Sequence, residues 1–174
     1  MNTRKMTGVI LLAATLMFVF SLSGFAQAVK NGYIDSDKIF LEYTEWNKAQ
    51  EEFNTDYNAW EVQAKEMQTE FEEMLEEYNR QRLILSDEKK KEREAAIEAK
   101  KKALDAFTGQ VFGPGGEAER RNNALIQPLL EKINAAIEQV ATDGNYDFVF
   151  NSAGLAYAKK DYDITEKVLD ILEE

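Results

Sequence analysis

A series of apolar residues, spaced alternately by three and four positions, dominates the first half of the chain. Its members are Tyr43, Trp46, Phe53, Tyr57, Trp60, Ala64, Met67, Phe71, Met74 and Tyr78, with Gln50 as the one polar member. This spacing puts them on one face of a helix and predicts a long coiled-coil helix with a single apolar seam. Most positions carry rings or thioethers, which bury large areas but interlock poorly between only two helices. The seam therefore predicts an arm with accessible apolar surface, suited to holding other molecules rather than to catalysis.

A second helix is expected to return along the first. The first helix is predicted over residues 36 to about 85, and Ser86 followed by two acids is typical of a new helix N-terminus. A reversal near Ser86 puts the lysines of 100–102 beside the glutamates of 70–73, so that opposite charges flank the seam. The sequence therefore predicts an antiparallel helical hairpin over residues 36–142 with its tip near 86.

The returning helix carries one interruption. Residues 113–116 read Gly-Pro-Gly-Gly, which cannot continue a helix. Helical periodicity resumes near Glu117 and runs to about residue 142. We expect the interruption to be a local bulge or a hinge in the arm.

The first 28 residues have the layout of a secretory signal peptide. Arg4 and Lys5 precede an apolar stretch at 9–20, and Ala26-Gln-Ala28 is typical of a cleavage site. Cleavage after Ala28 removes two positive charges and no negative ones, so the net charge changes from −11 to −13. Export without any cysteine favours the bacterial periplasm. Retention of this segment as an anchor at the inner membrane is the alternative.

Residues 29–35 and 143–174 are expected to form a small α+β body. Apolar and aromatic residues predict three short strands at 29–35, 146–151 and 155–158, followed by a final helix. Such a body cannot bury enough apolar surface alone, which favours completion by oligomerisation. The residues expected at the contact between chains are Tyr33, Ile34, Phe148, Phe150, Leu155 and Tyr157.

The composition argues against an enzyme. The chain has no His and no Cys, the commonest acid–base, nucleophilic and metal-binding groups. Ser36 between two aspartates is better explained as a helix cap. Adjacent glutamates such as Glu72 and Glu73 diverge around a helix and indicate a solvated face. We therefore expect no catalytic residue, no metal and no cofactor. The strong negative charge also disfavours nucleic acid as a partner.

Motifs at both ends of the chain resemble one known family. They are NGYIDSDKIF at 31–40 followed by Glu42 and Tyr43, NYDFVFNS at 145–152, and DYDITEKV at 161–168. These segments resemble the opening, the closing strands and the last helix of the Skp (OmpH-like) periplasmic chaperones. The resemblance implies a homotrimer in which a β-body from three chains carries three hairpin arms around a cavity. It also implies an ATP-independent holdase that binds unfolded outer-membrane proteins and prevents their aggregation.

The part of the seam distant from the body is the expected client-binding surface. Its candidate residues are Trp60, Met67, Phe71, Met74 and Tyr78. The alternative is that these residues only form the core of the arm. An exported coiled-coil adaptor that binds one folded envelope partner would share the same seam and leader.

The predicted tip is basic, whereas residues 51–77 are predominantly acidic. The basic residues are Arg80, Arg82, Lys89, Lys90, Lys91 and Arg93. Such a tip predicts peripheral contact with a membrane surface or with acidic client segments. Solubility of the helix ends is the simpler explanation.

Overall fold

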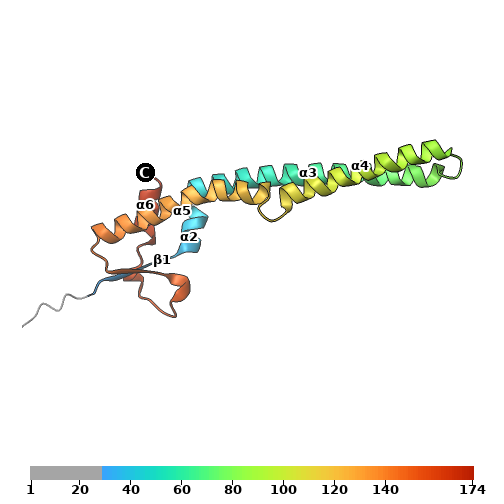
Figure 1. Cartoon of the computed structure of the whole chain (residues 1–174). Coiled ribbons are helices and arrows are strands. Elements are labelled where there is room, and N and C mark those ends of the chain that lie inside the picture. The colour runs from blue at the N-terminus through green and yellow to red at the C-terminus, as the bar shows by residue number, and fades with distance from the viewer. Residues whose placement is uncertain (1–28) are drawn as a thin grey trace, which may run out of the picture. The chain divides into compact units, whose positions relative to one another are not determined.

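A helical hairpin makes up most of residues 29–174, the part of the chain that the computed structural model describes (Figure 1). Helix α3 (Thr44–Gln81) runs outward, and α4 (Asp87–Phe112) and α5 (Glu117–Asp143) return along it. The side chain of Ser86 accepts a hydrogen bond from the Lys89 N–H and caps α4 as predicted. The predicted hairpin is confirmed, while the signal peptide at 1–28 and its cleavage after Ala28 lie outside the described residues.

The first helix is shorter at both ends than the periodicity predicts. The chain leaves the helical conformation at Tyr43, which separates α2 (Ser36–Glu42) from α3, and α3 ends at Gln81 rather than near 85. Tyr43 is extended and its ring is fully buried among the residues of the core. Burial raises the pKa of Tyr43 to about 12, with a further contribution from its hydrogen bond to Glu45. The burial of this ring in the core therefore accounts for the break between α2 and α3.

Ion pairs across the hairpin show that its register changes at the 113–116 loop. On the tip side Lys100 pairs with Glu70, as predicted. On the body side Arg121 pairs with Asp56 at 2.7 Å, and Lys132 pairs with Glu45. If the register of the Lys100–Glu70 pair continued into α5, Asp56 and Glu45 would meet residues that come earlier in the chain than Arg121 and Lys132. The loop is a local bulge that adds residues without adding length to the arm.

The loop is held in place by its neighbours rather than left as a free hinge. The Gly115 N–H donates to the Glu119 carboxylate at 2.7 Å, and the Gly116 N–H donates to the Gly113 carbonyl at 2.8 Å. The Arg120 guanidinium donates to the Gly115 carbonyl at 2.5 Å. Gly115 has a φ of +67°, in the left-handed region that glycine adopts without strain.

Substitutions of two glycines are expected to have opposite effects on the stability of the arm. Gly109→Ala adds a methyl group in open space within α4 and should raise the free energy of unfolding by about 0.5–1 kcal/mol. Gly116→Ala would put its Cβ 2.5 Å from the Val111 carbonyl oxygen and should lower the melting temperature. Thermal unfolding followed by far-ultraviolet circular dichroism measures both. A Gly116→Ala variant as stable as the parent would show that the loop shifts to accommodate the methyl group without loss of stability.

The body contains a two-stranded parallel sheet. Strand β1 (Asn31–Ile34) pairs with β2 (Phe148–Asn151), and the whole hairpin is the crossover that a parallel pair requires. The predicted third strand at 155–158 is wrong, because this segment is irregular and lies between short 3₁₀ turns at Ser152–Gly154 and Lys160–Tyr162. Residues 155–158 meet no strand within 29–174 with which to form a ladder.

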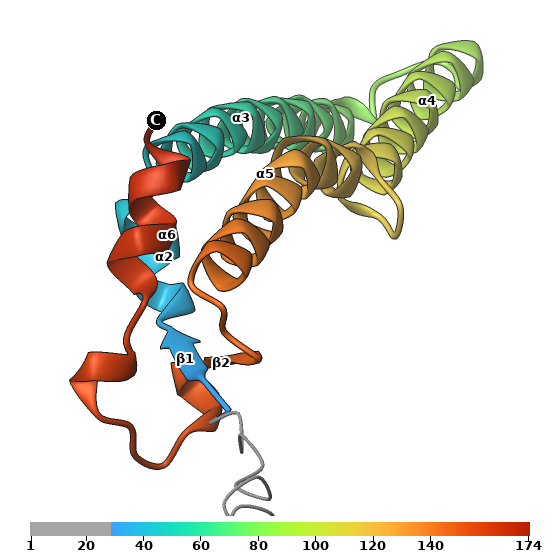
Figure 2. The same ribbon diagram turned by 90° about the vertical axis from the view of Figure 1, so that its left-hand side faces the viewer.

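The core lies where both ends of the chain meet the base of the hairpin. Helix α6 (Thr165–Leu172) packs against α2 and α5 (Figure 2). The buried residues that form this core are Ile34, Ile39, Tyr43, Ala49, Leu129, Ile133, Ala136, Val140, Ile164, Val168 and Leu169. Ile34 is thus largely buried within its own chain and leaves little surface for the predicted contact between chains.

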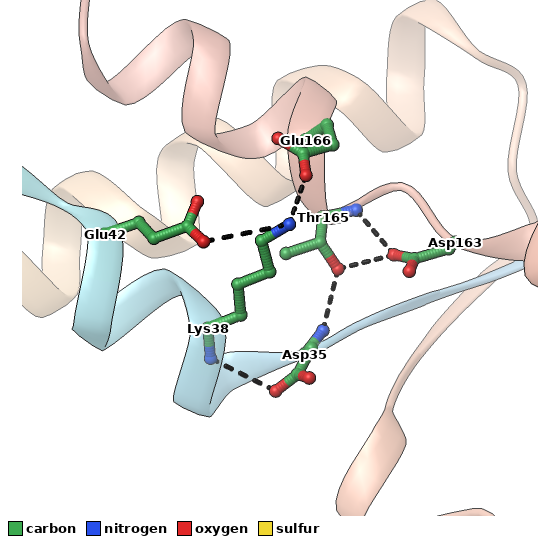
Figure 3. A network of polar contacts seen from close by, with 6 residues as sticks. All are labelled: Asp35, Lys38, Glu42, Asp163, Thr165 and Glu166. Atoms are coloured by element: carbon green, nitrogen blue, oxygen red, sulfur yellow. Dashed lines mark hydrogen bonds and ion pairs between the residues drawn. The ribbon is translucent and has the colours of Figure 1, made fainter.

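A polar network joins the start of α2 to the start of α6 (Figure 3). The buried Thr165 hydroxyl accepts from the Asp35 N–H at 2.9 Å and donates to Asp163 at 2.5 Å. Lys38 pairs with Glu166, and the hydrogen bond to Glu166 is the main cause that raises the pKa of Lys38. Thr165 therefore satisfies a backbone donor that lies 130 positions away in the chain.

Thr165→Val is expected to lower the free energy of unfolding by about 1–3 kcal/mol, because it leaves the Asp35 N–H without its acceptor. Thr165→Ser keeps the hydroxyl and should lose clearly less. Urea denaturation of both variants at one protein concentration measures the difference. A Thr165→Val variant as stable as the parent would show that the hydrogen bonds of Thr165 do not contribute to stability.

Candidate functional site

The distal seam, defined as Trp60, Met67, Phe71, Met74 and Tyr78, is incompletely covered by its own chain. All five side chains are half-buried. From residue 50 to residue 110, every residue of α3 and α4 remains at least partly exposed. The predicted client residues therefore lie together along one arm and retain accessible apolar surface.

The composition of α4 explains why the distal seam stays open. Between its charged residues α4 carries small side chains, at Ala95, Ala96, Ala99, Ala103 and Ala106. Its larger apolar residues Ile97, Leu104 and Phe107 are themselves only half-buried. A pair of helices buries only the narrow strip between them, and the alanines on the exposed faces of α4 add no cover, so the rings and thioethers of the seam keep part of their area in water.

The seam nearer the body is closed by ring contacts. Trp46 stacks on Phe40 with 4.4 Å between ring centroids. Tyr57 contacts the edge of Phe112 at 5.6 Å, and Phe53 lies 5.8 Å from Tyr57. These rings stabilise the base of the arm, in line with the alternative that part of the seam is core. Ring contacts of this kind are found only near the body among residues 29–174, and the distal seam has none.

Charged and polar groups border the distal seam. Glu77 pairs with Arg93 at 3.7 Å, and the Tyr78 hydroxyl donates to Glu94. This hydrogen bond is the main cause that raises the pKa of Tyr78. The surface combines apolar patches with flexible charged side chains, an arrangement suited to weak contacts with varied sequences rather than to one fixed ligand.

Residues 29–174 contain neither a metal-binding cluster nor a membrane-spanning helix. No group of His, Cys, Asp or Glu side chains there has an arrangement that would hold a metal ion. No helix in the same region combines the length and the apolar character needed to cross a bilayer.

Most basic residues of the tip are engaged by acids of the same chain. Arg80 pairs with Glu76 and Lys90 with Asp87, each at 3.3 Å. Lys89 pairs with Glu92, and Arg93 pairs with Glu77 as described above. Arg82 and Lys91 have no ion pair within residues 29–174. The predicted basic patch is therefore partly neutralised.

The tip also presents apolar residues that the sequence analysis missed. Leu83 and Ile84 are 88% and 86% exposed, and they lie in the turn between α3 and α4. The signal was an apolar triplet, completed by Leu85, at a position where turn residues are normally polar. The longer helix predicted there placed all three residues in α3.

The body retains an exposed aromatic surface beside an open sheet edge. Phe148 and Phe150 of β2 stack at 6.2 Å between centroids, and both are exposed. Tyr157 is more exposed still, while Tyr33 and Leu155 are half-buried. Only β1 pairs with β2 among the described residues, so the outer edge of β2 has backbone groups free for another strand.

Sequence and fold are both similar to known proteins. The family model of OmpH-like outer membrane proteins matches residues 30–172. The chaperone protein Skp of Yersinia enterocolitica is 24% identical over 161 residues, which cover 91% of this chain and 95% of that protein. The crystal structure of an OmpH-like outer membrane chaperone of Caulobacter crescentus CB15 matches with a TM-score of 0.73 at 13% identity, covering 83% of this chain and 84% of that one. The structural match shows a shared fold.

Proposed function

Because the chain belongs to the Skp/OmpH-like family of chaperones, as the resemblance of its end motifs indicated, we propose that it is an ATP-independent holdase for unfolded outer-membrane proteins. The proposal rests on the distal seam, whose rings and thioethers lie along one arm and are only half-buried. A chaperone that holds unfolded chains needs such accessible apolar surface.

Weak contacts at many points account for both binding and release. Each half-buried ring can offer an unfolded segment on the order of 1 kcal/mol. Several contacts on one tethered client multiply through effective concentration, so a long client is held although no single contact is tight. Because each contact opens readily, release requires no nucleotide.

The body supports assembly of three chains. A two-stranded sheet is too small to be stable alone, and its outer strand presents stacked Phe148 and Phe150 beside unpaired backbone groups. Joining these edges would cover the aromatic surface, including Tyr157, and bring the arms of a homotrimer around one cavity. The predicted signal peptide would deliver this assembly to the periplasm.

The proposal is tested by the light-scattering mass of the mature protein, alone and with a urea-diluted outer-membrane β-barrel protein. We expect a mass near three chains that rises to a soluble complex containing one client. A monomer or dimer that leaves the client to precipitate would support the structural adaptor instead. An adaptor would show saturable binding to one folded partner and no effect on denatured chains.

A further inference from the structure

Two methionines lie within the distal seam, and they are the only sulfur-containing residues of 29–174. Met67 and Met74 are seven positions apart in α3, so they lie on the same face of the helix, with Phe71 between them. Both methionine side chains are half-buried, whereas the core where the ends of the chain meet the hairpin contains no methionine among the described residues. Both thioethers of residues 29–174 therefore lie on the surface assigned to clients.

The opposite helix leaves both methionines partly open to solvent. The ion pair between Lys100 and Glu70 aligns this part of α3 with α4. The large apolar residues of α4 on either side of Lys100 are Ile97 and Leu104, and both are themselves only half-buried. Because neither helix is closed over the seam here, a solute as small as hydrogen peroxide can reach the two thioethers.

We propose that Met67 and Met74 form an oxidation site through which a peroxide lowers the affinity of the distal seam for unfolded clients, an inference that rests on the proposed holdase function. The sulfur lone pair attacks one oxygen of hydrogen peroxide, so that an S–O bond forms and the O–O bond breaks. The proton of the transferred hydroxyl passes to the departing hydroxide, which leaves as water. The sulfur is oxidised by two electrons and the peroxide is reduced by two, giving methionine sulfoxide and water.

Oxidation changes the chemistry of the seam at its centre. A sulfoxide is polar and binds water, so an apolar client segment must displace that water to reach the seam. The two sulfoxides flank Phe71, whose ring is left as an isolated apolar patch between them. With no cysteine in the chain, these thioethers are the groups that a peroxide oxidises most readily. Methionine sulfoxide reductases reverse the modification, so the site can act as a switch.

The test is treatment of the full mature chain with hydrogen peroxide, followed by peptide mass spectrometry and by light scattering of a urea-diluted outer-membrane β-barrel protein. We expect one added oxygen atom on each methionine. The chaperone concentration that halves client aggregation should rise by about tenfold or more, since two apolar contacts are lost at every arm. Methionine sulfoxide reductases with a thiol reductant should restore the original concentration.

Met67→Leu combined with Met74→Leu is the matched variant, because leucine is apolar and similar in size to methionine but has no sulfur. The variant is compared with itself before and after peroxide, so its own starting affinity does not enter the comparison. Its concentration for half suppression should be the same in both samples. Bound client should also slow the oxidation of Met67 and Met74 in the parent, because the client covers both side chains.

The oxidation site is rejected if both methionines carry oxygen and suppression is unchanged, or if peroxide weakens the leucine variant as much as the parent. It is also rejected if the methionines react only after urea has unfolded the chain, because they would then be closed within the arm. Circular dichroism of the oxidised parent should be unchanged, and a loss of helix would assign the effect to unfolding instead. An untreated parent that fails to suppress aggregation rejects the holdase function itself, and the switch with it.

Discussion

Truncation of Ile39 to alanine is expected to lower the free energy of unfolding by about 2–5 kcal/mol, a large part of what holds a small domain together. Ile39 is 0% exposed and lies in the core where α2 meets α6 and the base of the hairpin. The cavity left by the missing side chain would be lined by other core residues that cannot collapse fully. Because this core joins the two ends of the chain, its loss should also separate β1 from β2.

Urea denaturation followed by circular dichroism measures this effect, at one protein concentration because assembly would contribute to the observed stability. Leu41→Ala is the matched control, since Leu41 lies two positions later in the same helix and is 75% exposed. It should change the free energy of unfolding by less than about 0.5 kcal/mol. Similar losses in the two variants would contradict the assignment of Ile39 to the core of the body.

Alanine at both Phe71 and Met74 is expected to raise the chaperone concentration needed to halve client aggregation by about tenfold or more. Both residues belong to the distal seam and are half-buried in the described chain. Each removed side chain should weaken the binding free energy of the client by on the order of 1 kcal/mol at every arm that the client touches. Alanine is the strongest helix former, so the arm should keep its helical content.

The matched control is alanine at Phe53 and Tyr57, whose rings pack together and against Phe112 near the base of the arm. This variant should melt at a lower temperature yet suppress aggregation more nearly like the parent. Light scattering of a urea-diluted β-barrel protein gives the suppression, and thermal unfolding gives the stability. If the Phe71 and Met74 variant instead melts earlier while suppression is unchanged, the distal seam is only the core of the arm.

Features that depend on neighbouring residues could be predicted from the sequence. Periodicity places the apolar residues of α3 on one face, and Ser86 with two acids begins α4, because capping and helical spacing are local. The pairing of Glu70 with Lys100 also follows once the turn is located, since two antiparallel helices align their residues in simple order. The placement of the distal seam along α3 follows for the same reason, and its role in client binding stays a prediction.

Features that depend on distant partners could not be predicted in this way. Tyr43 leaves the helix because its ring is buried among residues from the other end of the chain, although its spacing fits the seam. Residues 155–158 have the composition of a strand but no neighbouring strand within 29–174 with which to exchange hydrogen bonds. The change of register at the 113–116 loop is visible only in the ion pairs between α3 and the two returning helices. Leu83 and Ile84 lie exposed in the turn because α3 ends at Gln81, whereas the periodicity alone extends the helix to about residue 85. Local spacing and capping thus suffice for the arm and its seam, whereas packing and pairing with remote residues set the break at Tyr43 and the extent of the sheet.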